Sequence, residues 1–548
     1  MKIKIAKKAG FCMGVRRAVN LVLKALKAGH TPLYTYGPLI HNPQTLELLS
    51  KLGVIIIRNI NEEVPQGFCV IRAHGVPPSE KEGLSKRHKV IDGTCPRVLK
   101  VQSLASKAIS SGKKVVIIGD KDHAEVKGIL GYCDGKGYVV SSFKDIENLP
   151  PLKNYVILSQ TTQDQELFEL LSKEILSRYP GGEIINTICN ATEVRQGEVK
   201  RLCKVCEAIV VIGGKFSANT KRLAQIAEAE GKKVFLIENK EELPLEEIKK
   251  INTLGITAGA STPNWLINEV IDFLKTSTSL PYRIFRNFIL LNLHEVFLFL
   301  FLFSTLLFLN SSLFNSYTLS LLSFVFFFQF FRKVFHSYLT KDSFFFYYPL
   351  KGNFYTSKNK LSLFLLSLSL IFSLISGLLF IPRIISLIFI LIILDYLLLN
   401  SFFYIFLDSL FFISLILYLY PYWNETFLWF SLHILIILFL WNLYKELLYQ
   451  QSDGFLPRNF FILHFNLSEN QWFQLSYFLI FLSSIPFLVL LIKTKILYYL
   501  AFILYLLSYL FLFALLKRRP LGQILYFEAL FLVPPLLFFL LSIMFYKL

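Results

Sequence analysis

The sequence predicts an α/β protein in its first half and an all-α, polytopic membrane domain of about nine helices in its second half. Before residue 276, glycines, charged residues and short apolar runs alternate, which is typical of a soluble α/β domain. After it, Phe, Leu, Ile, Tyr and Ser dominate, in runs long enough to cross a bilayer. A chain of 548 residues is also too long for a single hydrophobic core. We therefore predict a domain over 1–275, a linker over 276–287 and a membrane domain over 288–548.

Short apolar runs followed by glycine-rich or polar turns predict the strands of the first half. They are VVIIG at 115–119, YVILSQTT at 155–162, AIVVIGG at 208–214 and KVFLIEN at 233–239. Helical stretches lie between such runs, and this alternation indicates parallel sheets. GKKVVIIGD at 112–120 and GKKVFLIEN at 231–239 resemble each other, which suggests an internal duplication. In folds of this kind, functional residues usually lie in loops beyond the carboxyl ends of the strands.

Net charge and cysteine content restrict the cellular context. The net charge of +19 is assigned to loops flanking membrane segments, so no nucleic-acid partner is expected. All seven cysteines lie within the first 206 residues. An odd number of cysteines behind an N-terminus without a secretion signal predicts reduced thiols in the cytoplasm.

Three cysteines stand in turn-like segments, in GFCMGV (Cys12), DGTCPRV (Cys95) and NTICNAT (Cys189). They are 83 and 94 residues apart, which is about the length of one α/β unit each. Three buried thiols in tight turns are one interpretation of this spacing. The other is that flanking Gly, Thr, Asn and Pro open backbone N–H groups toward sulfur. Three thiolates could then hold three irons of a 4Fe–4S cluster and leave the fourth iron open as a Lewis acid.

The remaining cysteines are predicted to pack. Cys203 and Cys206 form a Cys-x-x-Cys motif, but a single pair is a weak zinc signal, and the surrounding pattern indicates a helix leading into a strand. We expect both on a helix face. Cys69 and Cys133 are expected to be buried thiols of strands or turns.

Several polar loops suggest an anion-binding pocket. His41, His74 and His123 each stand beside glycine or proline turns or polar residues, although a single loop histidine is usually only solvated or capping. GGKFSANTKRL at 213–223 places hydroxyl and amide groups at a helix start, and AGAST and SQTT add more. The predicted donors are Ser217, Asn219, Ser261, Thr161 and Thr162. Each alone could be an N-cap; together they fit a diphosphate. Glu125 is the candidate proton donor, with a surface carboxylate as the alternative.

These motifs, in this order, resemble the 4-hydroxy-3-methylbut-2-enyl diphosphate reductase family over residues 1–275. The motifs NTICNATEVRQ, DGTCPRV, HAEVKG and AGASTP carry the resemblance. It implies three similar α/β units around a central 4Fe–4S cluster that is held by Cys12, Cys95 and Cys189. It further implies that His41, His74, His123, Thr161, Ser217, Asn219 and Ser261 bind the diphosphate. Glu125 would deliver protons, with Thr161 in the relay.

The implied reaction removes an allylic hydroxyl with two electrons and two protons, and it gives isopentenyl and dimethylallyl diphosphates. It is the last step of the methylerythritol phosphate route to isoprenoids. The implied partners are an allylic diphosphate substrate and an external one-electron donor of the ferredoxin or flavodoxin type. The loop KFSANT departs from the family, since Phe216 and Ala218 replace polar or smaller residues. We expect this to weaken binding by about 1 kcal/mol without loss of activity.

The second half is expected to be a multi-pass domain of the inner membrane, with the reductase domain in the cytoplasm. Nine apolar segments are predicted near 289–309, 314–331, 361–381, 384–399, 402–420, 427–444, 472–492, 496–516 and 524–545. This topology puts fourteen basic residues on the inner side and four on the outer side, in agreement with the positive-inside rule. Its two long loops, 332–360 and 445–471, would both be cytoplasmic.

The layout of this half resembles the UbiA-type intramembrane prenyltransferases, and YPLKG in the first loop is similar to a motif of that superfamily. Those enzymes hold magnesium diphosphate with several aspartates in each loop, whereas here Asp342 and Asp453 stand nearly alone. The half is therefore a degenerate relative that binds a prenyl diphosphate or a lipid, a plain membrane anchor, or an active transferase fed by the reductase. A different class of function also stays open, in which the chain is a membrane scaffold or transporter with an inert α/β module.

Overall fold

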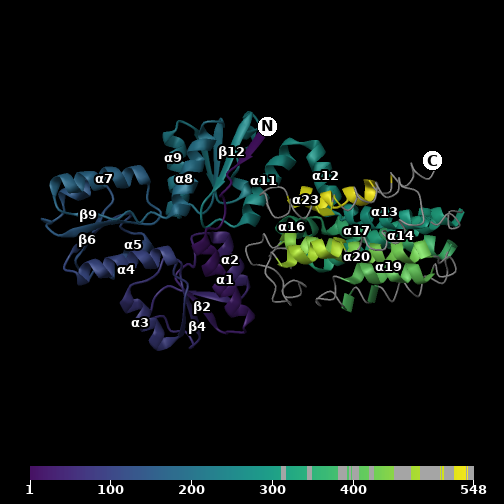
Figure 1. Cartoon of the computed structure of the whole chain (residues 1–548), viewed down its shortest axis with the longest axis horizontal. Coiled ribbons are helices and arrows are strands. Elements are labelled where there is room, and N and C mark those ends of the chain that lie inside the picture. Colours follow the sequence, from purple (N-terminus) through teal and green to yellow (C-terminus); the bar gives the residue numbers. More distant parts are fainter. Residues whose placement is uncertain are drawn as a thin grey trace. The chain divides into compact units, whose positions relative to one another are not determined.

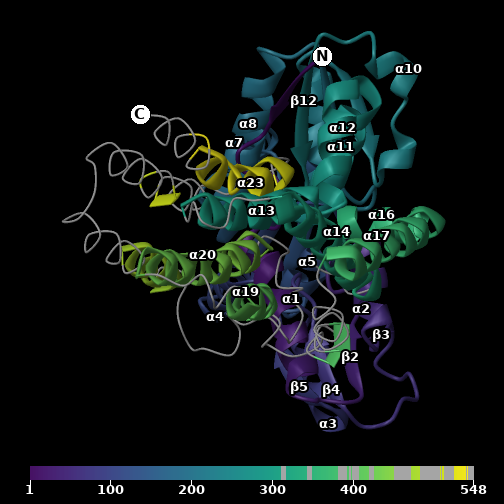
Figure 2. The same ribbon diagram turned by 90° about the vertical axis from the view of Figure 1, so that its right-hand side faces the viewer.

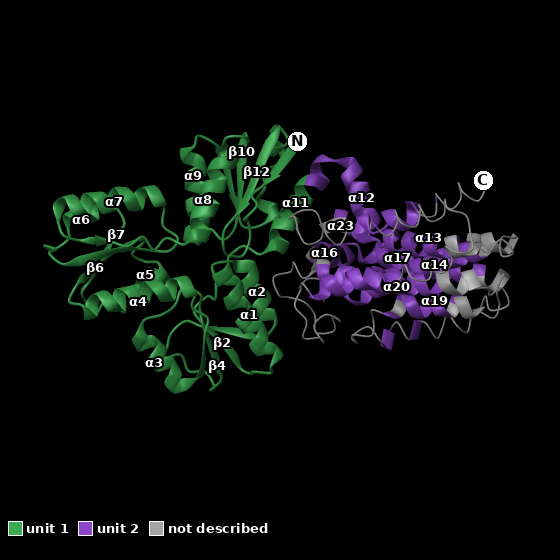
Figure 3. Ribbon diagram, viewed as in Figure 1, with its two compact units in different colours: residues 1–274 green, residues 275–548 purple. Residues whose placement is uncertain are grey.

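The computed structural model of the chain contains two compact units, residues 1–274 and 275–548 (Figure 3). The structure describes residues 1–309, 316–341, 348–380, 392–393, 396–397, 406–418, 425–449, 471–481, 507, 509–510, 524–537 and 540.

Three four-stranded sheets, all parallel, form the first unit (Figure 1), which confirms the prediction of an α/β fold with parallel sheets. In spatial order, sheet B contains β3 (Val54–Ile57), β2 (Leu33–Tyr36), β4 (Phe68–Ile71) and β5 (Lys89–Asp92). Sheet C contains β7 (Gly137–Val140), β6 (Lys114–Ile118), β8 (Tyr155–Ser159) and β9 (Glu183–Ile184). Sheet A contains β11 (Lys233–Ile237), β10 (Ala208–Ile212), β12 (Thr253–Ala258) and β1 (Lys2–Ile5).

The three sheets share one topology. In sheets B and C the spatial order is second, first, third and fourth strand along the chain. Sheet A has the same order, except that β1 from the N-terminus takes the place of the fourth strand. The duplication suggested by the sequence is therefore present in the topology, but the two GKKV segments do not mark it. One leads into β6, the first strand of its sheet, and the other into β11, a second strand.

Helices connect the strands and cover both faces of the sheets. They are α1 (Met13–Lys27), α2 (Pro43–Lys51), α3 (Pro78–Arg87), α4 (Pro96–Ser110), α5 (Ala124–Leu130), α6 (Phe143–Glu147), α7 (Gln165–Arg178), α8 (Asn190–Cys203), α9 (Ala218–Ala229), α10 (Leu245–Ile248) and α11 (Asn264–Thr278). Strand β6 shows why the apolar runs are continuous. Val116 and Ile118 pack with α6 and α7 on one face, while Val115 and Ile117 pack with α4 and α5 on the other (Figure 1).

The cysteines predicted to pack are buried in the apolar core. Cys203 ends α8 and packs with Val199 and Ile209. Cys206 belongs to the same cluster but lies beyond the end of α8, so the predicted helix-face position is correct for Cys203 alone. Cys69 lies on β4 and Cys133 follows α5, and both are fully buried.

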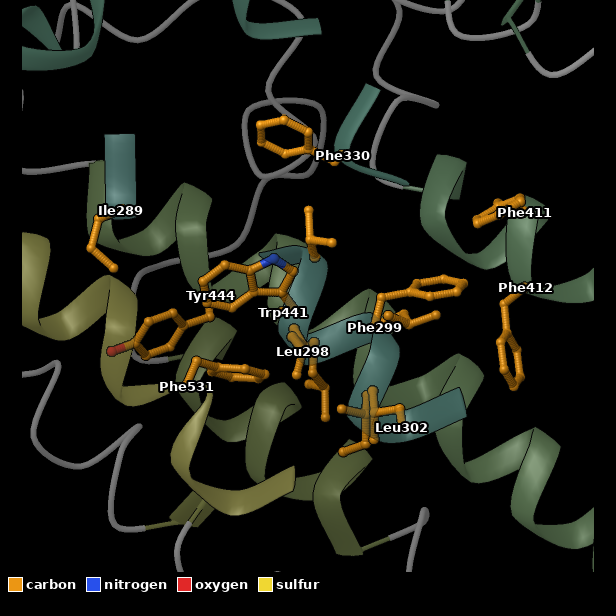
Figure 4. Packing of buried hydrophobic residues seen from close by; sticks show 14 of the residues in the cluster. Ile289, Leu298, Phe299, Leu302, Phe330, Phe411, Phe412, Trp441, Tyr444 and Phe531 are labelled. Atoms are coloured by element: carbon orange, nitrogen blue, oxygen red, sulfur yellow. The ribbon is translucent and has the colours of Figure 1, made fainter. Parts of the chain in front are cut away.

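The second unit is helical in its described parts (Figure 2). Its helices are α12 (Leu280–Leu290), α13 (Leu293–Leu309), α14 (Ser316–Leu339), α16 (Pro349–Ser357), α17 (Asn359–Phe380), α19 (Leu407–Tyr418), α20 (Glu425–Tyr449) and α23 (Ile524–Leu530). Aromatic and aliphatic side chains pack together in the core (Figure 4). The ring of Phe299 stacks on Phe411, and the rings of Trp441 and Tyr444 both contact Phe531.

The structure differs from several of the predictions for this half. The predicted linker over 276–287 is helical, because α11 continues to Thr278 and the Ser279 hydroxyl then caps α12. The first predicted loop, 332–360, contains the end of α14 and all of α16. Asp342 and Asp453 lie outside the described residues, as do most of 384–399 and 496–516.

The number of membrane-spanning helices is not confirmed as nine. Within the described ranges, one helical segment, Asn359–Ser376, is long and apolar enough to cross a bilayer. A second would be counted if Leu280–Leu290 and Leu293–Ser304, which meet at a bend of 66°, formed one broken span.

A group of buried charged side chains, here called the polar centre, lies inside this unit. Lys333 on α14 donates to Asp408 of α19 at 2.6 Å and contacts Glu295 of α13 at 2.7 Å. Lys445 of α20 reaches the same Glu295 oxygen at 3.1 Å. Gln329 donates to Asp408 at 3.0 Å. These charges are buried but paired with one another, which is the condition under which a protein interior tolerates them.

Candidate active site

Loops at equivalent places in the three sheets supply the predicted site residues. The loops after the first strands carry His41, His123 and Ser217; those after the third strands carry His74, Thr161 and Ser261; those after the fourth strands carry Cys12, Cys95 and Cys189. Glu125 and Asn219 begin the helices that follow two of these loops. All eleven residues line one pocket. Within each sheet, parallel strands direct their carboxyl-end loops to one edge, and the pocket lies where loops from these edges of the three sheets meet.

The three cysteines have matching backbone environments. Each is the N-cap residue of a helix, namely α1, α4 and α8. Each backbone N–H donates to a carbonyl in the third-strand loop of its own sheet: Cys12 to Ala260 at 3.0 Å, Cys95 to Ala73 at 2.9 Å and Cys189 to Thr161 at 2.9 Å. Three thiols therefore stand at three helix N-termini, where the helix dipole favours a thiolate.

The position of the Cys95 thiol depends on a glycine. A Cβ atom on Gly14 would overlap the Sγ atom of Cys95, so the start of α1 admits that thiol only because no side chain is present. The N–H of Val15 donates to the Sγ atom of Cys12 at 3.4 Å. Burial raises the pKa of Cys95; backbone hydrogen bonds from Arg97 and Val98 oppose this shift, and the neighbouring Cys12 and Cys189 add to it. Three thiols in one pocket suit an iron–sulfur cluster with one open iron better than a four-ligand zinc site.

The three histidines form a compact group, although each comes from a different loop. The ring centroids of His41 and His74 are 4.5 Å apart, and those of His74 and His123 are 5.3 Å apart. Burial is the main cause that lowers all three pKa values: His123 to about 4, His74 well below its ordinary value, and His41 in the same direction. Without a ligand they are neutral at pH 7, and each then offers one N–H donor.

Unsatisfied polar atoms mark the part of the pocket beside α9. Both side-chain polar atoms of Asn219, which is 4% exposed, have no hydrogen-bond partner, and neither does the Nδ1 atom of His74. Ser217 caps α9, and the hydroxyl of Ser261 donates to the His41 carbonyl at 3.1 Å. Buried orphan donors at a helix N-terminus are costly unless a ligand accepts from them, and an anion is the ligand that this geometry favours.

Glu125 and Thr161 form a buried hydrogen-bonded pair. The Thr161 N–H donates to Oε1 of Glu125 at 2.6 Å, and the Thr161 hydroxyl donates to Oε2 at 2.8 Å. Burial raises the pKa of Glu125 to about 7, although both hydrogen bonds oppose the shift. The Glu125 N–H donates to Nδ1 of His123 at 3.2 Å, which leaves Nε2 of that ring as its N–H donor. Glu125 can therefore hold a proton near neutral pH and release it through Thr161.

The structure also adds residues that the sequence did not single out. Arg97 and Thr192 line the pocket, each two or three positions after a cysteine. Both residues lie inside motifs already assigned to the site, Arg97 in DGTCPRV and Thr192 in NTICNAT, and this position could have identified them as pocket residues. The predicted donor Thr162 also lines the pocket, and its hydroxyl accepts from Gln160 at 2.8 Å. The exposed Phe216, at 83%, is absent from the lining.

Comparisons with known proteins agree on one family. The profile of the LytB protein family matches residues 3–275. The 4-hydroxy-3-methylbut-2-enyl diphosphate reductase of Citrifermentans bemidjiense is 42% identical over 273 residues, which cover 50% of this chain and 96% of the relative. The enzyme of the same name from Aquifex aeolicus is 44% identical over 273 residues, covering 49% and 94%. A solved structure of (E)-4-hydroxy-3-methyl-but-2-enyl diphosphate reductase is 42% identical, with a TM-score of 0.41, over 50% of this chain and 99% of that one.

Proposed function

The chain belongs to the LytB family through residues 3–275, and we propose that this half reduces 4-hydroxy-3-methylbut-2-enyl diphosphate to isopentenyl and dimethylallyl diphosphates. The reaction replaces the allylic hydroxyl with hydrogen, consumes two electrons and two protons, and releases water. The observation that carries the proposal is one pocket lined by three thiols, three histidines and a buried carboxyl group. A similar protein is described as the terminal enzyme of the non-mevalonate pathway, and we assign the same step here.

Cys12, Cys95 and Cys189 would hold a 4Fe–4S cluster. The fit rests on their shared position at helix N-termini and on the clearance that Gly14 gives to Cys95. When bound, such a cluster supplies electrons one at a time and offers one iron without a protein ligand as a Lewis acid. The electrons would come from a ferredoxin- or flavodoxin-like protein.

The polar part of the pocket would bind the diphosphate. Neutral His41, His74 and His123 supply N–H donors, and a bound diphosphate would favour their protonation. Ser217 and Asn219 add donors at the N-terminus of α9, and Ser261 adds a hydroxyl. This anchor would hold the substrate with its hydroxyl end toward the cysteines. Such positioning lowers the activation free energy, because the translational and rotational entropy of the substrate is already lost on binding.

Glu125 would supply protons. Its carboxyl group with a pKa of about 7 carries a proton in a large share of molecules at neutral pH. The Thr161 hydroxyl, 2.8 Å from Oε2, can pass that proton to the departing hydroxyl group, which leaves as water. A second proton must reach the allyl carbon, so the pair has to be reprotonated from solvent between steps.

Anaerobic purification of the full chain tests this proposal. We expect iron and sulfide in the purified protein, and turnover of the substrate when a chemical one-electron reductant is present. The alternative, a membrane scaffold or transporter with an inert α/β module, predicts a folded chain with neither cluster nor turnover.

For the second unit we propose a multi-pass body of the inner membrane that keeps the reductase in the cytoplasm and binds a prenyl chain or lipid. The support is α17, which is apolar along its length and yet exposes large side chains such as Phe364, Ile371 and Ile375. A water-soluble protein rarely exposes such a surface. The resemblance to UbiA-type transferases stays a prediction. Because Asp342 and Asp453 stand nearly alone where those enzymes have several aspartates, we expect no transfer when labelled dimethylallyl diphosphate and an aromatic acceptor are added.

A further inference from the structure

Arg195 links the segments that carry two of the three cysteines. It lies on α8 and is only 6% exposed. Its Nη2 atom donates to the Gly10 carbonyl at 2.7 Å, and its Nη1 atom donates to the Ala191 carbonyl at 2.9 Å. Gly10 stands two residues before Cys12, and Ala191 stands two residues after Cys189. One planar guanidinium therefore joins a loop of sheet A to the helix that follows sheet C.

The loop that receives Arg195 can adopt its shape because residue 10 is a glycine. Gly10 has a φ of +101°, and a Cβ atom there would overlap the side chain of Asn264. The fixed fork of a guanidinium suits two carbonyls that face it from different directions, which a single ammonium group cannot reproduce. The contact thus depends on the identity of both residues.

The charge of Arg195 has few local partners. Burial lowers the pKa of this guanidinium, while Cys12 and Cys189, ahead of Glu198, act in the opposite direction. Its Nε atom is buried without a hydrogen-bond partner. Glu198 is itself engaged, since it accepts from the Lys8 N–H at 2.8 Å and contacts Arg201 at 3.7 Å. A buried charge requires compensation, and Cys12 and Cys189, with any group that they bind, favour the charged form of Arg195 more than Glu198 does.

We propose that Arg195 is a positioning residue of the iron–sulfur site: it holds the Cys12 and Cys189 segments together and raises the reduction potential of the cluster. This inference rests on the proposed function of the first unit. The electrostatic reason is that each one-electron reduction adds negative charge to the cluster, and a buried cation nearby stabilises the reduced form. A higher potential makes the cluster easier to reduce by a one-electron donor of moderate strength.

Two variants separate charge from geometry in the full chain, purified without oxygen and loaded with iron and sulfide. Arg195→Gln removes the charge, and Arg195→Lys keeps it but cannot span both carbonyls. Arg201→Gln, on the exposed side of the same helix, is the matched control. The measurements are the reduction potential, from a titration followed by electron paramagnetic resonance, and the rate at which each protein loses its chromophore to an iron chelator.

We expect Arg195→Gln to shift the potential to a more negative value and Arg195→Lys to stay near the wild-type potential. Both should lose the cluster several-fold faster than wild type, and Arg201→Gln should match wild type in both measurements. An unchanged potential in Arg195→Gln at full iron content would overturn the proposal. If Arg195→Gln holds no cluster, the test rests on Arg195→Lys. Faster loss of its chromophore than in the wild type supports the role of Arg195 in holding the two segments together, and loss at the wild-type rate refutes it. A wild-type chain without iron would instead refute the proposed function.

Discussion

The pocket of the first unit and the polar centre of the second unit bury polar side chains in opposite ways. In the first unit, the buried polar groups around the pocket are left incomplete, since Asn219 and His74 have atoms without partners. In the second unit, Lys333 binds Glu295 and Asp408 at once, and Lys445 binds Glu295 as well. Burial of a polar group is therefore not, by itself, evidence of a ligand-binding site. An unsatisfied atom that lines a pocket indicates a missing ligand, whereas a paired charge between helices indicates a structural role.

The largest effect should follow from removing one thiol. Cys95→Ser leaves only two sulfur ligands, so we expect complete loss of the brown chromophore and of turnover. Absorbance and iron analysis of the anaerobic protein measure this. Cys203→Ser is the control, since that buried thiol packs in the core of sheet A, and it should keep both. Equal iron content in the two variants would remove Cys95 from the ligand set.

The next effect concerns proton supply. Glu125→Gln keeps the shape and a hydrogen bond but cannot donate a proton, so we expect the cluster to be retained and the rate to fall by ~10²–10⁴-fold. In the wild type the donor form exists below the raised pKa of about 7, so the rate should fall as pH rises through about 7. The pH profile of the variant should lack this limb. Wild-type turnover in the variant would exclude Glu125 from the mechanism.

Breaking a paired charge in the second unit should affect stability and leave catalysis intact. Lys333→Met leaves Glu295 and Asp408 short of a buried partner, and we expect ~3–5 kcal/mol less stability in that unit. Tryptophan fluorescence during thermal unfolding suits the measurement, because four of the five tryptophans lie after residue 275. Lys341→Met is the control, with little expected change. A loss of reductase activity at unchanged stability would contradict the structural role.

The smallest effect is expected from removing Asn219, a pocket side chain without hydrogen-bond partners in the first unit. Asn219→Ala should raise KM by ~5–30-fold, which corresponds to one or two lost hydrogen bonds to the diphosphate. Stability should not fall, because neither polar atom of this side chain has a partner within the protein. Steady-state kinetics and a melting curve check both statements, with the exposed Asn148→Ala as the control. A lower melting temperature with an unchanged KM would show that Asn219 stabilises the fold and does not bind the substrate.

The site of the first unit was largely predictable because its residues follow strand ends in recognisable motifs. The resemblance to the reductase family grouped Cys12, Cys95 and Cys189, whereas their spacing alone also allowed three separate buried thiols. Parallel strands explain only why each cysteine lies at the carboxyl-end edge of its own sheet. The return of β1 to complete sheet A could not be predicted, since strand pairing is a long-range property that local patterns do not carry. Arg195 was missed for the same reason, because its partner Gly10 is distant in the sequence.

The second unit was harder to predict for a physical reason. In an apolar sequence the periodic contrast between buried and exposed positions disappears, so segment ends and connecting helices such as α16 leave little signal. The pairing of Lys333 with two carboxylates on other helices is likewise invisible in the sequence, where all three residues look like isolated charges.

The iron and acid-labile sulfide content of the anaerobically purified full chain tests the central claim most directly. If Cys12, Cys95 and Cys189 hold a 4Fe–4S cluster, the wild-type chain should carry about four irons and four sulfides, and Cys95→Ser should carry almost none. A folded wild-type chain without iron after reconstitution, or a Cys95→Ser chain with the same iron content, would contradict it.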